Sequence, residues 1–302
     1  MVDFELIFEG RYWETTISAS EKYMLLTKSK RVLLYDFKEK TLLREINVKD
    51  ILYATFSADE DYIILQSSTS ISIYSVSDDA VIKRILTGQA PAYPKIYGCK
   101  LIYAVRHKNW DSSIICYDIL TGKKQTLYRL PSSLVRSFEI HSDCVYITAS
   151  DTPENTTYYV IKYDFLSEKT DMYSFEIKGT LLNTVAYSSY LSKLIYLSKI
   201  DNRPNDFALY SIDIQSGKTE LLKEFIKISM PVEIRCCKNL LFISKPFAFS
   251  VFDLKSNDEH EFSFFPVALI HPCDNNDYFR VSNGEYSSVY KITNKTGDGS
   301  VS

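Results

Sequence analysis

Glycine is scarce in this sequence, with 9 residues among 302, and none of them stands in a loop pattern that cradles phosphate. The sequence contains neither G-x-x-x-x-G-K-S/T nor G-x-G-x-x-G, the two glycine-rich patterns that wrap nucleotide phosphates. G-x-S-x-G and H-E-x-x-H are also absent, so the usual signatures of an α/β-hydrolase and of a zinc protease are missing. The common enzyme motifs therefore give no lead to function.

Cysteine and histidine are also few, and neither is spaced as a ligand set. The six cysteines form no C-x-x-C pair and are too sparse for a disulfide scaffold. The four histidines show no spacing typical of metal ligands. We therefore expect reduced core cysteines, no metal and no cofactor.

No sign of charge dominates, and no apolar run is long. The 35 Lys and Arg residues are scattered among 38 Asp and Glu residues, which gives a net charge of −3 and no basic stripe that would neutralise phosphates. No run approaches the length of a membrane span, and the opening MVDFELIFEG does not resemble a secretory leader. We therefore expect no nucleic acid, no membrane association and a cytoplasmic location.

What the sequence does contain is typical of β-structure. Hydrophobic residues make up 45% of the chain and aromatic residues 14%, including 23 Tyr and 17 Phe. This composition supports a large buried core and lies far from that of disordered chains. Tyr and Phe, together with frequent Ile, Val and Thr, fit a pleated strand better than a helix. We predict an all-β protein.

One pattern recurs seven times: an apolar strand that ends in an aromatic residue and usually an aspartate. Its copies lie at residues 32–36, 71–75, 114–118, 160–164, 209–213, 249–253 and 287–291. The aligned positions are Tyr35, Tyr74, Tyr117, Tyr163, Ile212, Phe252 and Tyr290, so consecutive copies are 39, 43, 46, 49, 40 and 38 residues apart. This spacing suits a propeller blade of four strands, which takes about 40 to 50 residues. We predict a seven-bladed β-propeller of four-stranded antiparallel blades.

The segments around each copy complete the predicted blade. An apolar run precedes each copy and is predicted as strand b, at residues 23–27, 62–66, 100–105, 144–149, 193–197, 240–244 and 278–281. The aromatic copy is strand c, and we expect its aromatic residue to pack between blades and its aspartate to cap the following turn. An outer strand d then follows, and an inner strand a, such as residues 51–57, opens the next unit.

The seventh unit lacks a strand d, because only a polar tail follows Tyr290. Residues 4–8, FELIF, are therefore predicted to pair with the last blade and to close the ring, which leaves no long open sheet edge. We predict one domain over residues 1–292 and a polar tail over 293–302. The predicted blades span about residues 10–49, 50–89, 90–132, 133–179, 180–229, 230–265, and 266–292 with strand 3–9.

The repeat resembles that of the WD40-like propellers over nearly the whole chain. Its Tyr-Asp or Phe-Asp ending stands where that family has Trp-Asp, although the family's Gly-His element is absent throughout. The resemblance implies a protein-interaction platform as the commonest role, although a fold does not by itself fix a function. We expect a monomeric, non-catalytic scaffold that binds a protein partner.

The connection between strands b and c is enlarged in the third, fourth and fifth blades. In propellers this connection emerges on the same face as the linkers between blades, so the three loops are expected to rise together. The predicted partner-binding residues on these loops are Arg106, His107, Lys108, Trp110, Asp111, Asp151, Glu154, Asn155, Asp201, Asn202, Arg203 and Asp206. A tryptophan flanked by charges is typical of interaction hot spots. Alternatively, Trp110 folds back on its own loop, and Asp201 and Arg203 form an ion pair that only stabilises theirs.

A second hypothesis is a propeller enzyme with lactonase- or lyase-like chemistry at the mouth of the central channel. The polar residues of the predicted inner strands are Arg136, Glu139, Asn183, Glu233, Arg235 and His271, with His141 just beyond one of them. Glu and His side chains that converge can bind a metal or move protons. The plainer interpretation is that these charges pair with one another across a wet channel.

Overall fold

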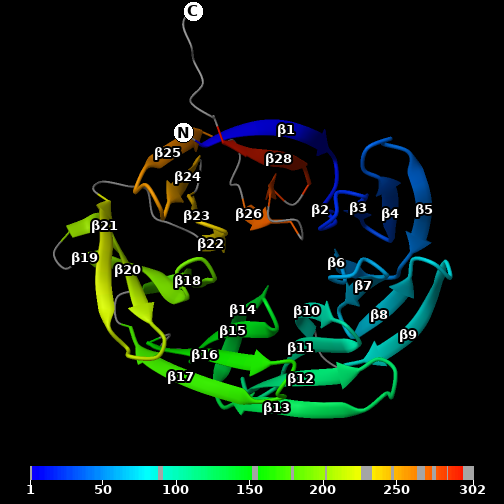
Figure 1. Cartoon of the computed structure of the whole chain (residues 1–302), viewed down its shortest axis with the longest axis horizontal. Helices are drawn as coiled ribbons and strands as arrows, with labels where there is room; N and C mark the ends of the chain where they lie inside the picture. The colour runs from blue at the N-terminus through cyan, green and yellow to red at the C-terminus, as the bar shows by residue number, and fades with distance from the viewer. Residues whose placement is uncertain are drawn as a thin grey trace, which may run out of the picture.

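Figure 1 shows seven sheets arranged in a ring, in a computed structural model of the chain. The structure describes residues 2–87, 91–151, 156–177, 180–200, 203–225, 233–245, 248–263, 269–273, 277–283 and 285–294. These residues form 28 β-strands in seven four-stranded sheets. Within them there is no helix that is long and apolar enough to cross a membrane. The predicted seven-bladed, all-β propeller is confirmed.

Blades 1 to 4 each consist of four consecutive antiparallel strands, numbered from the axis outwards. Blade 1 comprises β2 (Glu14–Ile17), β3 (Tyr23–Lys28), β4 (Arg31–Asp36) and β5 (Leu42–Asn47). Blade 2 comprises β6 (Ile51–Phe56), β7 (Tyr62–Ser67), β8 (Ser70–Ser75) and β9 (Ala80–Leu86). Blade 3 comprises β10 (Pro91–Tyr97), β11 (Lys100–Arg106), β12 (Ser112–Asp118) and β13 (Lys124–Leu130). Blade 4 comprises β14 (Ser133–His141), β15 (Cys144–Asp151), β16 (Thr157–Asp164) and β17 (Thr170–Glu176).

Blades 5 and 6 follow the same plan, and blade 7 draws its outer strand from the other end of the chain. Blade 5 comprises β18 (Thr180–Ser188), β19 (Lys193–Ile200), β20 (Arg203–Asp213) and β21 (Thr219–Phe225). Blade 6 comprises β22 (Glu233–Cys237), β23 (Leu240–Ser244), β24 (Ala248–Asp253) and β25 (Glu259–Ser263). Blade 7 comprises β26 (Leu269–Pro272), β27 (Tyr278–Ser282), β28 (Ser287–Asn294) and β1 (Val2–Gly10).

The predicted strands b and c fall on the second and third strands of every blade. These two strands are apolar on both faces because each sheet is packed between two neighbouring sheets, as in β7, where five of six residues are buried. The cores lie between blades: Ile64 of blade 2 packs in one cluster with Tyr103 and Tyr117 of blade 3. Tyr117 is only 7% exposed, so the aromatic residue of this copy packs between blades as expected.

In five of the blades an aspartate side chain caps the turn after strand c, as the sequence predicted. Its carboxylate accepts backbone N–H groups of the turn at Asp36, Asp118, Asp164, Asp213 and Asp253. In blade 3, the N–H of Thr121 donates to Asp118 Oδ1 at 2.7 Å, and this hydrogen bond is the main cause that lowers the pKa of Asp118. With the aspartate counted as the first residue of the turn, the fifth residue adopts a positive φ. In blade 3 this residue is Gly122, which tolerates the conformation easily, and in blade 1 it is Lys40, with φ 53°.

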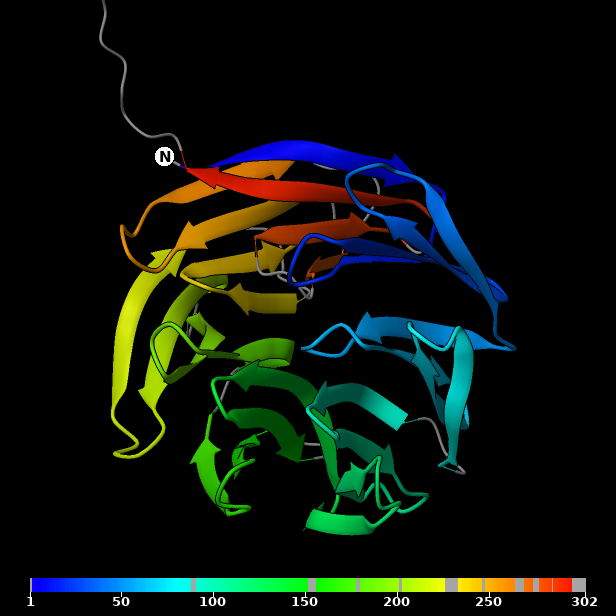
Figure 2. The ribbon, with the colours of Figure 1, turned by 45° about the vertical axis from the view of Figure 1, so that its right-hand side comes forward.

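The N-terminal strand closes the ring. β1 pairs antiparallel with β28, from Val2 opposite Asn294 to Gly10 opposite Ser287, and Figure 2 shows the blue and red strands side by side. A β-bulge at Ile7 shifts the register between Leu6 and Phe8. The predicted pairing of residues 4–8 with the last blade is confirmed. β28 continues through Thr293 and Asn294, while residues 295–302 of the expected tail lie outside the described residues.

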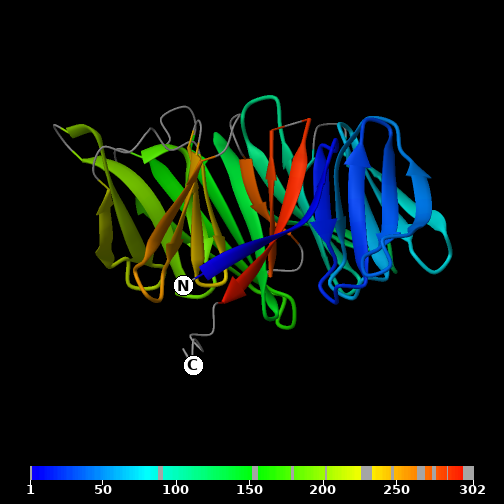
Figure 3. The same ribbon diagram turned by 90° about the horizontal axis from the view of Figure 1, so that it is seen from above.

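The ring has two different faces, seen edge-on in Figure 3. We call the face that carries the b-to-c hairpins and the linkers between blades the linker face; the hairpin of residues 107–111 lies on it. The opposite face carries the a-to-b and c-to-d turns, and we call it the turn face; the start of β1 lies on this side. Strand a of each blade stands closest to the axis, so inner-strand side chains border the channel (Figure 1).

Candidate interaction surface

The hairpin of blade 3 has a defined structure on the linker face. His107 N–H donates to the Asp111 carbonyl at 2.7 Å, and Trp110 N–H donates to the His107 carbonyl at 3.1 Å. The Asn109 amide donates to Asp111 Oδ2 at 2.6 Å, and His107 Nε2 lies 2.7 Å from Ser113 Oγ. Trp110 adopts φ 68°, an uncommon backbone conformation for a bulky residue. Such a conformation persists where surrounding contacts impose it, and those contacts extend beyond the hairpin.

The same hairpin is tied to the linker that leads into blade 4. Ser133 N–H donates to the Trp110 carbonyl, and Ser132 N–H donates to Asp111 Oδ1, both at 2.9 Å. The bond from Ser132 is the largest cause that lowers the pKa of Asp111, and the bond from Asn109 is the next. Asp111 thus stabilises the loop as a carboxylate. The predicted loop is therefore a braced element that joins two blades.

Trp110 and Arg106 form one exposed unit. The Arg106 guanidinium lies 3.7 Å from the centroid of the Trp110 ring, well within the range of a cation–π contact. The Trp110 side chain nevertheless stays 50% exposed, so the indole is held in place without being buried. His107 and Lys108 are also exposed beside it. Trp110 thus folds against its own hairpin, as the alternative interpretation expected, and still presents an open aromatic face.

The enlarged hairpin of blade 4 is described only in part. Asp151 ends β15, and its Oδ1 accepts N–H groups from Thr156 at 2.8 Å and Thr157 at 2.9 Å. Asp151 therefore fixes the base of this loop through both bonds. Glu154 and Asn155, the other predicted residues of this loop, lie outside the described residues.

The connection in blade 5 differs from the predicted loop. Arg203 and Asp206 belong to β20, and Ile200 pairs with Arg203 across a register shift. The expectation that residues 201–206 form a loop was therefore wrong for Arg203 and Asp206. Hydrogen-bonded pairing in β20 begins at Arg203, before the apolar residues that the sequence pattern marks as the strand. Asp201 and Asn202 lie outside the described residues.

Arg203 contacts two carboxylates within blade 5. Its Nη1 lies 3.9 Å from Asp206 Oδ2 and 3.8 Å from Glu224 Oε2. The Arg203 side chain is 54% exposed, so these long contacts stabilise the sheet little. The guanidinium remains open to a partner.

Two further exposed aromatic residues, which the repeat pattern does not single out, lie on the linker face. Trp13 is 41% exposed in the connection between β1 and β2, and its N–H donates to the Thr27 carbonyl at 3.0 Å. Tyr286 is 42% exposed in the b-to-c hairpin of blade 7, where Asn283 Oδ1 accepts its N–H at 2.8 Å. Both tryptophans of the chain thus lie on one face. Trp13 was missed because its connection is short and carries no cluster of charges.

Charged side chains of the inner strands β2 and β22 form ion pairs near the central channel. Arg280 of β27 donates to Glu14 of β2 at 2.7 Å, which joins blade 7 to blade 1. In blade 6, Arg235 pairs with Glu233, and His271 Nε2 of blade 7 lies 4.0 Å from Glu233 Oε2. Burial lowers the pKa of His271 well below its usual value, and the two arginines act in the same direction, so this imidazole is neutral. Of the predicted channel residues, Arg235 and Glu233 thus pair within one strand and not across the channel.

Other predicted channel residues differ in their environment. Burial raises the pKa of Glu139 to about 8, although Arg235 and Lys95 act to lower it. Arg136 donates to Ser150 at 2.8 Å, and His141 is exposed at the end of β14. The side chain of Asn183 lies outside the described residues. Across the described part of the chain, no three His, Cys, Asp or Glu side chains are grouped as metal ligands.

The ring is similar to solved propellers over nearly its whole length. The Cps50 (Swd1) β-propeller domain of Myceliophteria thermophila has a TM-score of 0.68 at 9% identity, over 96% of this chain and 100% of that one. The Kuenenia stuttgartiensis hydrazine synthase has a TM-score of 0.66 at 13% identity, over 95% and 96%. The Pan2 WD40 domain of Neurospora crassa has a TM-score of 0.65 at 12% identity, over 97% and 96%.

At such low identities these likenesses show the fold alone, and the chain has the WD40-like propeller fold that its repeat predicted. No protein-family model matches the sequence, and no curated protein matches it significantly.

Proposed function

We propose that this protein is a non-catalytic scaffold that binds a protein partner through its linker face, chiefly through the b-to-c hairpins of blades 3 to 5. The observation that carries the proposal is the exposed Arg106–Trp110 unit on a hairpin braced against the next blade. An aromatic residue that is already held in one position loses little conformational freedom on binding, which favours affinity. The WD40-like fold supports the same role, since protein interaction is its commonest use.

The charges around Trp110 fit a polar rim around an aromatic anchor. Arg106 and Lys108 of blade 3 and Arg203 of blade 5 are exposed cations, and none of the three forms a close, buried ion pair with the described residues. The partner surface that suits this arrangement carries carboxylates around an apolar recess. Trp13 and Tyr286 offer a second contact on the opposite side of the ring.

The test is partner capture by the full chain in extracts of the native host, followed by affinity measurement with the partner identified by mass spectrometry. Trp110→Ala and Arg203→Ala are expected to abolish capture, with the Trp110 change weakening the affinity about 30-fold or more. Melting temperatures should stay nearly unchanged because both side chains are at least half exposed. Leu120→Ala is the control, because Leu120 is 78% exposed on the turn face. Unchanged capture by both linker-face variants would remove this surface from consideration.

The enzyme hypothesis is favoured by burial raising the pKa of two carboxyl groups beside the channel, those of Glu139 and Glu233. Against it, the channel carboxylates of Glu14 and Glu233 are each paired with an arginine. Glu139→Gln and His271→Ala separate the two hypotheses. A scaffold that uses the linker face should keep full partner capture in both variants, whereas loss of capture there, with retention in Trp110→Ala, would place the site in the channel.

A further inference from the structure

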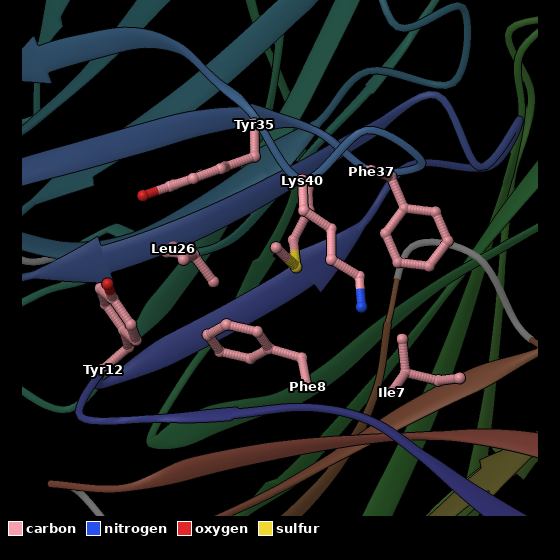
Figure 4. Close-up of a pocket in the computed structure, with 8 residues that line it drawn as sticks. Ile7, Phe8, Tyr12, Leu26, Tyr35, Phe37 and Lys40 are labelled. Atoms are coloured by element: carbon pink, nitrogen blue, oxygen red, sulfur yellow. The ribbon is translucent and has the colours of Figure 1, made fainter.

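A small apolar cavity lies at the seam where the ring closes, between β1 and blade 1 (Figure 4). Its volume is about 130 Å³. The walls are formed by Ile7 and Phe8 of β1, Met24 and Leu26 of β3, and Tyr35 and Phe37 of β4. An apolar protein cavity of roughly 150 Å³ is known to hold a benzene molecule, so this one has room for a single ring-sized or branched aliphatic group.

The seam is packed less tightly than the junction between blades 3 and 4, and this leaves room for the cavity. In blade 4, Tyr163 and Phe165 occupy the repeat positions of Tyr35 and Phe37 and are only 1% and 6% exposed. Phe165 there stacks on Tyr97 of blade 3, with ring centroids 4.4 Å apart. Tyr35 and Phe37 remain half-buried at the seam. When an apolar group covers partly exposed apolar surface of this kind, the burial contributes favourable free energy.

A lysine ammonium lies at the cavity. Lys40, the fifth residue of the turn after β4, lines it, and Figure 4 shows its nitrogen directed towards Phe8, Ile7 and Phe37. No ion pair to Lys40 is formed within the described part of the chain. The same turn position in blade 4 is Glu168, which pairs with Lys100. Lys40 thus has the opposite charge to Glu168 at the same turn position, and its ammonium group is available to a ligand.

A second cation marks the other end of the seam. Lys28 ends β3 and lies 6.0 Å from the centroid of the Tyr12 ring, which also borders the cavity. The seam therefore offers an aromatic-lined recess with one ammonium at each end. Neither lysine is held in an ion pair by the described residues. The complementary ligand is apolar at its centre and anionic beside it.

We propose that the seam cavity binds one apolar side chain of a partner peptide and that Lys40 binds a carboxylate on the adjacent peptide residue. The cavity admits only one such group, so the rest of the ligand lies outside it, as expected for a side chain that projects from a longer chain. The Tyr12 end of this site borders the linker face, but the site lies at the junction of β1 and blade 1 and does not include the Trp110 hairpin of blade 3.

The probe is the peptide acetyl-Ala-Phe-Asp-Ala-amide, and its matched control carries Asn in place of Asp. The full-length chain, labelled with ¹³C at Met and Ile methyl groups, is titrated with each peptide while the Met24 and Ile7 signals are followed by NMR. The Asp peptide is expected to shift both signals and to bind about fivefold more tightly than the Asn peptide, as for one partly exposed ion pair. Absence of shifts with both peptides at millimolar concentration would overturn the proposal.

Three variants assign the effect to the seam. Lys40→Met should bring the Asp peptide to the affinity of the Asn peptide without changing the latter. Ile7→Phe fills the cavity and should abolish binding of both peptides, with near-UV circular dichroism verifying the fold. Trp110→Ala should bind both peptides normally even if it has lost the linker-face partner. Equal loss of affinity for both peptides in Lys40→Met would contradict the role of the charge.

A final titration separates a peptide from a free acid. 3-Phenylpropionate carries the same ring and carboxylate without a peptide backbone. The proposal expects it to bind more weakly than the Asp peptide, because the peptide adds contacts along the seam. Binding of 3-phenylpropionate alone, with no shift from the peptide, would identify a small-molecule site and reject the peptide ligand.

Discussion

At the scale of single residues, the aromatic residue that ends strand c is a packing residue and its aspartate is a turn residue. Tyr117 is buried between blades 2 and 3, and Asp118 accepts N–H groups of the next turn. These are local roles, so they repeat wherever the pattern repeats. The sequence could reveal them for that reason.

Tyr117→Ala is expected to lower the free energy of unfolding by about 3 to 5 kcal/mol, because a buried aromatic side chain is lost and a cavity remains. Urea denaturation measures this change. Tyr117→Phe keeps the ring and should cost less than about 1.5 kcal/mol. A loss below about 1 kcal/mol for the alanine variant would show that the inter-blade core tolerates the cavity.

Glu139 is expected to make stability depend on pH. Its pKa is about 8 in the folded chain, above the ordinary value of 4.5, so the folded state binds the proton more tightly than the unfolded state. The stabilisation from this group is complete below about pH 4.5 and is lost as the pH rises through 8. Glu139→Gln should therefore show a flatter decline in unfolding free energy between pH 5 and pH 8. Parallel pH profiles for the two proteins would contradict the raised pKa.

At the scale of strands, β1 has a role that no other strand shares, because it joins the two ends of the chain. Phe4 of β1 packs with ring centroids 5.0 Å from both Phe262 and Phe279. Leu6, two residues later, is 50% exposed. The strand thus completes blade 7 and covers the edge of β28.

A chain that begins at Arg11 is expected to melt at a lower temperature and to associate, because β28 becomes an open edge. Thermal unfolding and size-exclusion chromatography at several concentrations measure both effects. Phe4→Ala in the full chain should cost about 2 kcal/mol or more, whereas Leu6→Ala should cost less than about 1 kcal/mol. A monomeric truncated chain of unchanged stability would show that closure by β1 is dispensable.

The b-to-c connections show where strand prediction fails. Their lengths were evident from the repeat, but the boundary between loop and strand in blade 5 was not, and Arg203 and Asp206 lie in β20. Hydrogen-bonded pairing can continue into polar residues, because backbone groups form the ladder whatever the side chain. Judged by polarity alone, the start of β20 was therefore placed too late in the sequence.

At the scale of the whole molecule, the ring decides which distant residues share a surface. Trp13 and Trp110 are 97 positions apart, yet both lie on the linker face. The pairing of Glu14 with Arg280 likewise joins the first and last blades. The repeat could predict neither the shared face of the two tryptophans nor this ion pair, because it gives the order of the blades and not the orientation of individual side chains.

The sequence by itself determined the number of blades, the position of strands b and c, and the closing strand, since each follows from local apolar periodicity and from a missing strand at one end. Only the tertiary structure decided that Trp110 is braced yet exposed, that Lys40 has no ion-pair partner among the described residues, and that the seam holds a cavity. These features depend on how side chains from different blades fill the space between them, and that packing is set by three-dimensional neighbours which a linear pattern does not contain.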